Sequence, residues 1–148
     1  MTRRVDYSQR IDIPLELAWM VVGDFGSLLR WLPGEEQSSI VLHGNGIGMT
    51  RDLTLSTVGE VQHRLDELDH AAHRLTYSLT RGRPLGMQSY SVSVSLAGDE
   101  EHCILHWVGE FEPEPEADAA AMAENLAGAY RNMSVGLEKL LEGWQDHG

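Results

Sequence analysis

Two residues that can carry chemistry, Arg51 and His63, stand where the alternation of strand residues predicts apolar side chains. Arg51 precedes Leu53 by two positions, and His63 lies between Val61 and Leu65, so both share an apolar strand face. A histidine there could act as a general base near neutral pH, and an arginine could hold a carboxylate or a developing enolate. The alternative is a hydrogen-bonded histidine that only orients a ligand or another side chain.

Tyr77, Tyr90 and Tyr130 are candidate hydrogen-bond donors to a ligand carbonyl. The alternative is that they are core residues whose hydroxyls are satisfied within the protein. We assign Tyr90 with His63 and Arg51 to the catalytic group. The predicted ligand-contacting residues are Phe25, Trp31, Leu53, Tyr77, Met87, Trp107, Phe111, Leu126, Tyr130 and Met133.

Metal and nucleotide chemistry are poorly supported. His102 and His106 share a strand face but stand about 13 Å apart at 3.3 Å per residue, too far to bind one ion. The glycine run from Gly44 to Gly48 leads into a strand, whereas a phosphate-binding loop leads into a helix. Cys103 lies in an apolar run and is expected to be a buried small hydrophobe. We therefore expect no metal and no other cofactor.

The element that must organise these residues is a C-terminal helix from Asp118 to about Gly143. Its apolar residues recur at steps of three and four, which places them on one helix face. Asp118 is a good N-cap, and Pro113 and Pro115 keep the preceding segment out of helix. Gly128 and Gly136 interrupt this helix and leave room for close packing or for a ligand.

The rest of the chain predicts one strand, two short helices and six further strands. A strand over 5–13 is followed by helices over 14–22 and 27–32, and the remaining strands span 38–43, 49–55, 59–68, 74–80, 88–96 and 103–111. Their short connections predict antiparallel neighbours. Tyr90 and Trp107 belong to inward faces, and the serines of the 88–96 strand face water.

Length and charge limit the function classes. The 148 residues, with no linker, form a single domain over 1–148. A net charge of −12 argues against nucleic acid or anionic lipid as partners. No apolar run is long enough for a membrane span or a signal peptide, so no membrane insertion and a cytoplasmic location are expected.

Several short motifs, in order, resemble one superfamily. They are Ile13-Pro14 with Ala18-Trp19, Asp24-Phe25 followed by Trp31 and Pro33, Gly48 followed by Arg51, His63-Arg64-Leu65 up to Asp69, Leu75-Thr76-Tyr77, Tyr90, and Trp107 to Phe111. On these the chain resembles the START/Bet v 1-like helix-grip superfamily, and within it the bacterial polyketide cyclase/dehydrase and lipid-transport group.

The resemblance implies an α+β helix-grip fold of order β-α-α-β6-α. A curved antiparallel sheet of about seven strands would surround the long helix and enclose an internal hydrophobic cavity. The Gly44 to Gly48 hairpin, with 81–86 and 24–33, is expected at the cavity mouth. Related sequences commonly have glutamate at the position of His63 and often histidine at that of Leu32, so the role of the usual glutamate does not carry over.

The resemblance further implies a function on a hydrophobic, partly oxygenated small molecule. We expect a polyketide cyclase or dehydratase assisted by His63, Arg51 and a tyrosine. The alternative is a non-catalytic carrier of a lipid-like or polyketide-like metabolite, and a third is a protein-interaction module with an exposed apolar patch. The possible partners are biosynthetic enzymes, and a second copy of the chain in a homodimer.

Overall fold

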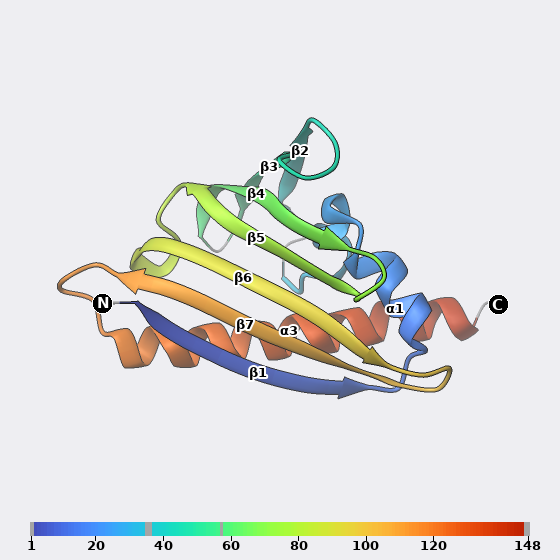
Figure 1. Cartoon of the computed structure of the whole chain (residues 1–148). Coiled ribbons are helices and arrows are strands. Elements are labelled where there is room, and N and C mark those ends of the chain that lie inside the picture. The colour runs from blue at the N-terminus through green and yellow to red at the C-terminus, as the bar shows by residue number, and fades with distance from the viewer. Residues whose placement is uncertain (1, 35–36, 57, 147–148) are drawn as a thin grey trace.

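A long helix lies beneath a curved sheet in the computed structural model, which describes residues 2–34, 37–56 and 58–146 (Figure 1). The elements are β1 (Arg3–Ile11), α1 (Leu15–Val22), the 3-10 turn η1 (Phe25–Ser27), α2 (Leu28–Trp31), β2 (Ser39–His43), β3 (Thr50–Leu55), β4 (Gly59–Asp69), β5 (Arg74–Arg81), the 3-10 turn η2 (Pro84–Gly86), β6 (Met87–Gly98), β7 (Cys103–Pro113) and α3 (Ala119–Asp146). This is the β-α-α-β6-α order that the sequence predicts.

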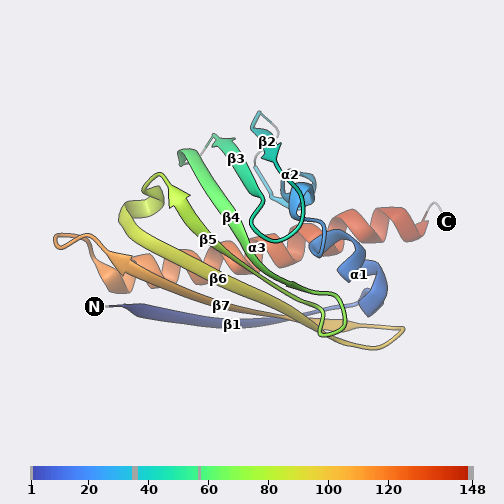
Figure 2. The same cartoon turned by 45° about the horizontal axis from the view of Figure 1, so that its top comes forward.

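The sheet has seven strands in the order β1-β7-β6-β5-β4-β3-β2, and every neighbouring pair is antiparallel. The first strand, β1, therefore forms one margin of the sheet and pairs with the last strand, β7, while β2 forms the other margin (Figure 2). The register places Arg51 opposite His63 and Tyr90 opposite Phe111. Since directly opposed residues share a face, the chemistry-bearing residues of β3 and β4 lie side by side.

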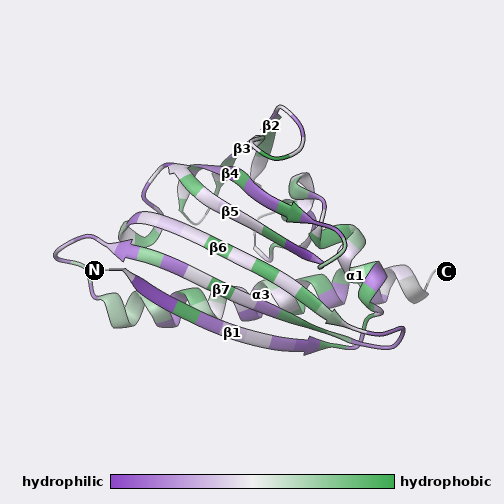
Figure 3. Ribbon diagram, viewed as in Figure 1, coloured by the Kyte–Doolittle hydropathy of each residue, from purple (hydrophilic) through white to green (hydrophobic). Residues whose placement is uncertain are grey.

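Alternation along the strands separates the interior from the solvent (Figure 3). In β6 the residues Tyr90, Val92, Val94 and Leu96 are buried, whereas the intervening serines are half-buried or exposed. In β7 the buried residues are Cys103, Leu105, Trp107, Gly109 and Phe111. The inward faces predicted from residue parity are confirmed.

Helix α3 closes the concave side of the sheet. Asp118 caps it, because its carboxylate accepts from the backbone N–H of Ala121 at 3.1 Å and its carbonyl from that of Met122 at 3.0 Å. Its buried stripe is Met122, Leu126, Tyr130, Met133, Leu137 and Leu141. The helix packs mainly on β1, and to a smaller extent on β7 and α2.

Some predicted boundaries are wrong. The first strand ends at Ile11 and not at Ile13, because the backbone N–H of Asp12 turns from β7 to the Glu138 carboxylate of α3, 2.8 Å away. The predicted 27–32 helix is divided into η1 and α2, because the Asp24 carboxylate holds the Gly26 N–H at 3.1 Å and starts the 3-10 turn early. Helix α3 continues past the predicted Gly143 to Asp146.

Candidate functional site

Arg51 and His63 form a buried pair across β3 and β4. Their side chains are only 3% and 8% exposed. The Nε–H of Arg51 donates to Nδ1 of His63 at 3.2 Å, and its Nη1–H donates to the carbonyl oxygen of Phe25 at 2.8 Å. Adjacent strands thus supply both side chains, and the turn η1 supplies a fixed acceptor for the guanidinium.

Aromatic rings enclose the guanidinium in place of a carboxylate. Its Cζ lies 4.0 Å from the ring centre of Phe25 and 4.5 Å from that of Tyr77, distances at which the ring faces attract a cation. Burial lowers the pKa of Arg51 to about 10, so it remains charged at neutral pH. Among the described residues no acidic side chain pairs with it, and its Nη2 is buried without a hydrogen-bond partner.

The contact with Arg51 determines which proton His63 carries. Because Nδ1 accepts from a cationic donor, the neutral imidazole holds its hydrogen on Nε2, at the far edge of the ring. Burial, and next the charge of Arg51, keep the pKa of His63 well below 6.5. His63 therefore has the properties of a neutral hydrogen-bond donor more than those of the general base that the sequence suggests.

We expect the protein to become less stable as the pH is lowered, because His63 has a lower pKa in the folded protein than in the unfolded chain. The unfolded histidine titrates near 6.5 and the folded one lower, so the unfolded chain binds more protons between these values. The free energy of unfolding should then decrease by up to about 1.4 kcal/mol per pH unit as the pH falls below about 6.5. Urea denaturation of wild type and His63→Gln at matched pH measures it, because glutamine keeps an acceptor and a donor but does not titrate. A stability difference between the two that is equal at every pH would contradict the assignment.

An apolar pocket of about 310 Å³ opens beside His63 between the sheet and α3. It is lined by Leu32, Pro33, Leu55, Val58, Val61, His63, Pro84, Leu85, Met87, Tyr90, Ala129 and Asn132. His63 and Tyr90 are the titratable residues of this wall, and the Asn132 amide adds a polar group on α3. Leu85 adopts φ 57°, a left-handed conformation uncommon for leucine, where η2 borders the pocket.

The space on the Arg51 side is almost filled. A void of about 10 Å³, about one water molecule in size, is lined in part by Arg51, Tyr77 and Met133. Trp31 and Trp107 also line it. The predicted site residues therefore fall into separate groups: His63, Tyr90 and Met87 on the pocket; Arg51, Tyr77, Trp31, Trp107 and Met133 on the void; Phe25, Leu53, Phe111, Leu126 and Tyr130 buried and on neither.

Tyr90 and Tyr130 share a hydrogen bond at 2.6 Å. Burial raises the pKa of both phenols, so both stay protonated at neutral pH. Tyr130 stacks on Trp107 with ring centres 5.0 Å apart, and a Cβ at Gly109 would collide with its hydroxyl. Since one shared hydrogen bond uses one of the two phenolic protons, the pair retains a second proton for another acceptor.

The pocket is lined by residues from two of the three predicted rim segments, Leu32 and Pro33 from one and Pro84 and Leu85 from the other. The Gly44 to Gly48 hairpin is not among its lining residues. That hairpin leads into the start of β3, whereas Leu55, at the other end of β3, lines the pocket. Ala129 and Asn132 also line the pocket although they are not among the predicted ligand-contacting residues, and their i, i+3 spacing beside Met133 was the available signal.

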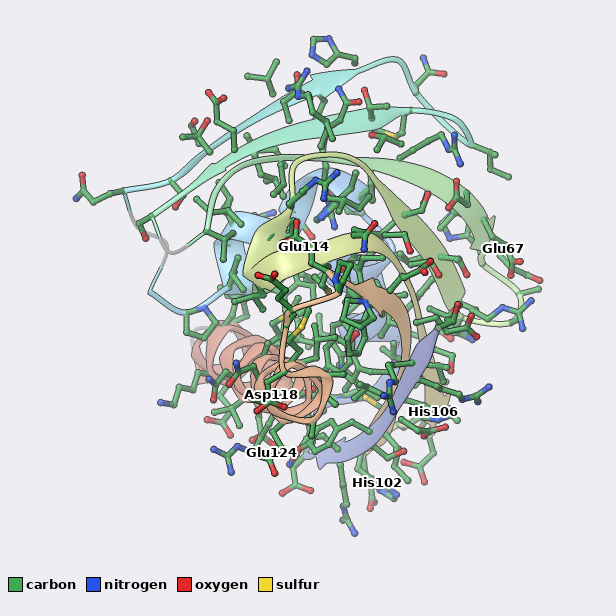
Figure 4. The ribbon with its side chains drawn as sticks, turned by 90° about the vertical axis from the view of Figure 1, so that its left-hand side faces the viewer. Glu67, His102, His106, Glu114, Asp118 and Glu124 are labelled. Atoms are coloured by element: carbon green, nitrogen blue, oxygen red, sulfur yellow. The ribbon has the colours of Figure 1, made fainter. Side chains whose placement is uncertain are left out.

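His102 and His106 are both engaged with carboxylates. His106 Nε2 lies 2.7 Å from Asp6 Oδ1, and His102 Nδ1 lies 3.5 Å from Asp99 Oδ1. Figure 4 shows both histidines on the outer side of the sheet, directed away from the interior. The described residues contain no group of three or more His, Cys, Asp or Glu placed to bind a metal ion. None of the helices in the described part of the chain is long and apolar enough to span a bilayer.

Comparisons with known proteins place this geometry in context. A family model described as polyketide cyclase/dehydrase and lipid transport matches residues 2–142. An uncharacterised Bacillus thuringiensis protein of known structure is 22% identical with a TM-score of 0.80, over 93% of this chain and 97% of its own. Norcoclaurine synthase from Thalictrum flavum, solved with dopamine and hydroxybenzaldehyde, is 18% identical with a TM-score of 0.76, over 97% of this chain and 88% of its own.

A Thermobifida fusca protein is 27% identical with a TM-score of 0.66, over 83% of this chain and 79% of its own. A search among proteins of curated function finds no match. The structural likenesses show that the chain has the Bet v 1-like helix-grip fold.

Proposed function

The chain belongs to the polyketide cyclase/dehydrase and lipid-transport family, and from this premise we propose that it acts on a hydrophobic, partly oxygenated small molecule bound beside His63. The reaction we favour is a cyclisation or dehydration. The observation that carries the proposal is His63, which lines an otherwise mostly apolar pocket and is held from behind by the buried Arg51.

The size and lining of the pocket support a compact ligand. A volume of about 310 Å³ lies at the lower end of the range for small-molecule sites. Aliphatic residues would bury the carbon skeleton, while His63, Tyr90 and Asn132 would meet its oxygen atoms. Such a wall suits a ketide-like molecule with one or two rings better than a long acyl chain.

Hydrogen-bond donation is the chemistry that we assign to His63. Its Nε2–H would donate to a ligand carbonyl, and the adjacent Arg51 cation would make that N–H more acidic and favour negative charge on the oxygen. A polarised carbonyl is more electrophilic, and its α-protons are more acidic. Both effects favour the aldol-type closures and the loss of water that cyclases and dehydratases promote.

Arg51 would act through His63 in this scheme. It lines the small void and not the pocket, so it orients the imidazole without touching the ligand. This differs from the direct carboxylate-binding role expected from sequence. Among the described residues no carboxylate pairs with the guanidinium, so its positive charge behind the site supports the stabilisation of a developing enolate.

A non-catalytic carrier is the second candidate, and the proton chemistry of the pocket wall favours it. The pKa of His63 is depressed and that of Tyr90 is raised, so neither exchanges protons readily at neutral pH. A carrier needs only the apolar walls and the hydrogen-bond donors. The two candidates share the pocket and differ in turnover.

Native mass spectrometry of the purified protein tests the shared part of both candidates. We expect a bound metabolite of low mass that is absent from Ala129→Phe, because a phenyl ring on α3 would occupy the pocket. Ala120→Phe is the matched control, since Ala120 is exposed on the same helix and should leave the ligand in place. Equal occupancy in both variants would place the ligand elsewhere.

A further inference from the structure

The two margins of the sheet differ in how they are protected. β1 carries Arg3, Arg4, Asp6 and Arg10, and α3 packs along it. β2 has no charged residue, no proline and an unbroken register with β3. Exposed strand edges present unpaired backbone groups, and proteins commonly block them with charges, prolines or bulges. β2 lies at the margin of the sheet (Figure 2), and its residues Ser39–His43 have none of these protections.

Exposed hydrophobic residues gather in β2 and in the turn that connects it to β3. Val41 is 54% exposed, Leu42 46% and Ile47 65%. The sequence from Gln37 to Thr50 contains no Asp, Glu, Lys or Arg, although the whole chain has a net charge of −12. This is therefore a segment through which another copy of an acidic protein can approach with little local repulsion.

The β2 sequence is symmetric in character about its centre. It reads Ser39-Ile40-Val41-Leu42-His43, with polar residues at both ends and aliphatic residues between them. Antiparallel pairing of two copies about a two-fold axis at Val41 would oppose each Ser39 to the partner's His43 and each Ile40 to the partner's Leu42. Every polar end meets a polar end, and every aliphatic residue meets an aliphatic one.

We propose that β2 is a homodimerisation edge, at which a second copy of this chain adds its own β2 antiparallel and continues the sheet across the dimer. Val41 of both copies lies on the outer face, as does its β3 neighbour Asp52. Ile40 and Leu42 lie on the inner face with Leu53 and Arg51. The proposal is independent of the ligand, because no β2 residue lines the pocket.

Sedimentation velocity over a range of concentrations at about 0.15 M salt tests the proposal. A single added strand is a small interface, so we expect a monomer–dimer equilibrium with a dissociation constant on the order of 10–100 µM. Val41→Lys would place two lysines opposite each other and should raise that constant at least about 10-fold. Val41→Lys should raise the dissociation constant even though the added lysine lowers the net negative charge of each copy. Met20→Lys, at an exposed hydrophobic residue of α1, should leave it unchanged.

A cysteine variant reports the register. Directly opposed antiparallel residues have Cα atoms about 4.5–5.5 Å apart, within disulfide range. Val41→Cys should therefore form a covalent dimer with oxidised glutathione, while Met20→Cys should not. A wild type that stays monomeric up to about 1 mM, or a dimer that survives Val41→Lys, would overturn the proposal. So would a monomeric wild type whose hairpin binds vesicles of neutral lipid, since the edge would then be a lipid-contact surface.

Discussion

Replacing His63 by leucine is expected to slow product formation about 100-fold or more, while replacing it by glutamine retains most of the rate. Leucine removes the N–H that would stabilise the developing oxyanion, and the loss of one such donor typically costs 10²- to 10³-fold. Glutamine can accept from Arg51 Nε–H through its amide oxygen and donate through its amide N–H. It thus replaces both hydrogen bonds of the neutral imidazole without being able to take a proton.

The same pair of variants separates a donor from a general base. If His63 removes a proton from the substrate, glutamine should be as inactive as leucine, because a positioned base contributes about 10²- to 10⁴-fold. The measurement is product formation from linear poly-β-carbonyl substrates, compared with spontaneous cyclisation in buffer. A wild type that matches buffer on several such substrates would favour the carrier.

Arg51→Met tests the positioning role of the arginine through the pH profile. Without the adjacent cation, the pKa of His63 should rise toward its usual value. Burial, the larger cause of the depressed pKa, remains in the variant, so we expect the rate to begin falling on acidification at a higher pH than in wild type. An unchanged pH profile in the variant would show that Arg51 does not set the state of His63.

The placement of Arg51 and His63 could be predicted from the sequence because strand alternation is a local property. Each residue stands two positions from a buried aliphatic residue, such as Leu53 or Val61, and antiparallel hairpins bring β3 against β4. The long helix was predictable for a similar reason, since its apolar stripe and the Asp118 cap are both encoded within one segment.

What the pair can do chemically was not predictable, because it depends on contacts between distant segments. The tautomer of His63 follows from the 3.2 Å contact with Arg51. The orientation of Arg51 follows in turn from the Phe25 carbonyl, 26 positions away in sequence. Likewise, the Trp107–Tyr130 stack fills space that the apolar pattern alone would assign to a ligand.

The roles of the two glycines Gly128 and Gly136 inside α3 also depend on distant segments, and we expect their replacement to have opposite effects on stability. A Cβ at Gly136 would collide with the carbonyl oxygen of Trp31 and lie 3.0 and 3.2 Å from ring atoms of Pro33, whereas a Cβ at Gly128 would meet nothing within 4 Å. Gly136 therefore permits α3 to approach α2, and Gly128 has no such role. Local sequence offers no means to tell them apart.

We expect Gly136→Ala to destabilise the protein by about 2 kcal/mol and Gly128→Ala to stabilise it by about 1 kcal/mol. Overpacking against rigid backbone costs up to about 3 kcal/mol, which alanine offsets by about 1 kcal/mol of helix propensity. At Gly128 there is no overpacking, so only the gain in helix propensity remains. The difference of about 3 kcal/mol corresponds to roughly 6–12 °C in Tm for a chain of this size.

Thermal and urea denaturation of the two variants beside wild type measure the difference, with Gly143→Ala as a second open-site control. Because Trp31 lies in α2 and lines the void next to Arg51, Gly136→Ala should also disturb the site, whereas Gly128→Ala should leave ligand retention unchanged. If Gly136→Ala were as stable as wild type, α2 would have to move away from α3 at little cost. The close approach of these helices would then not be what holds Trp31 against the site.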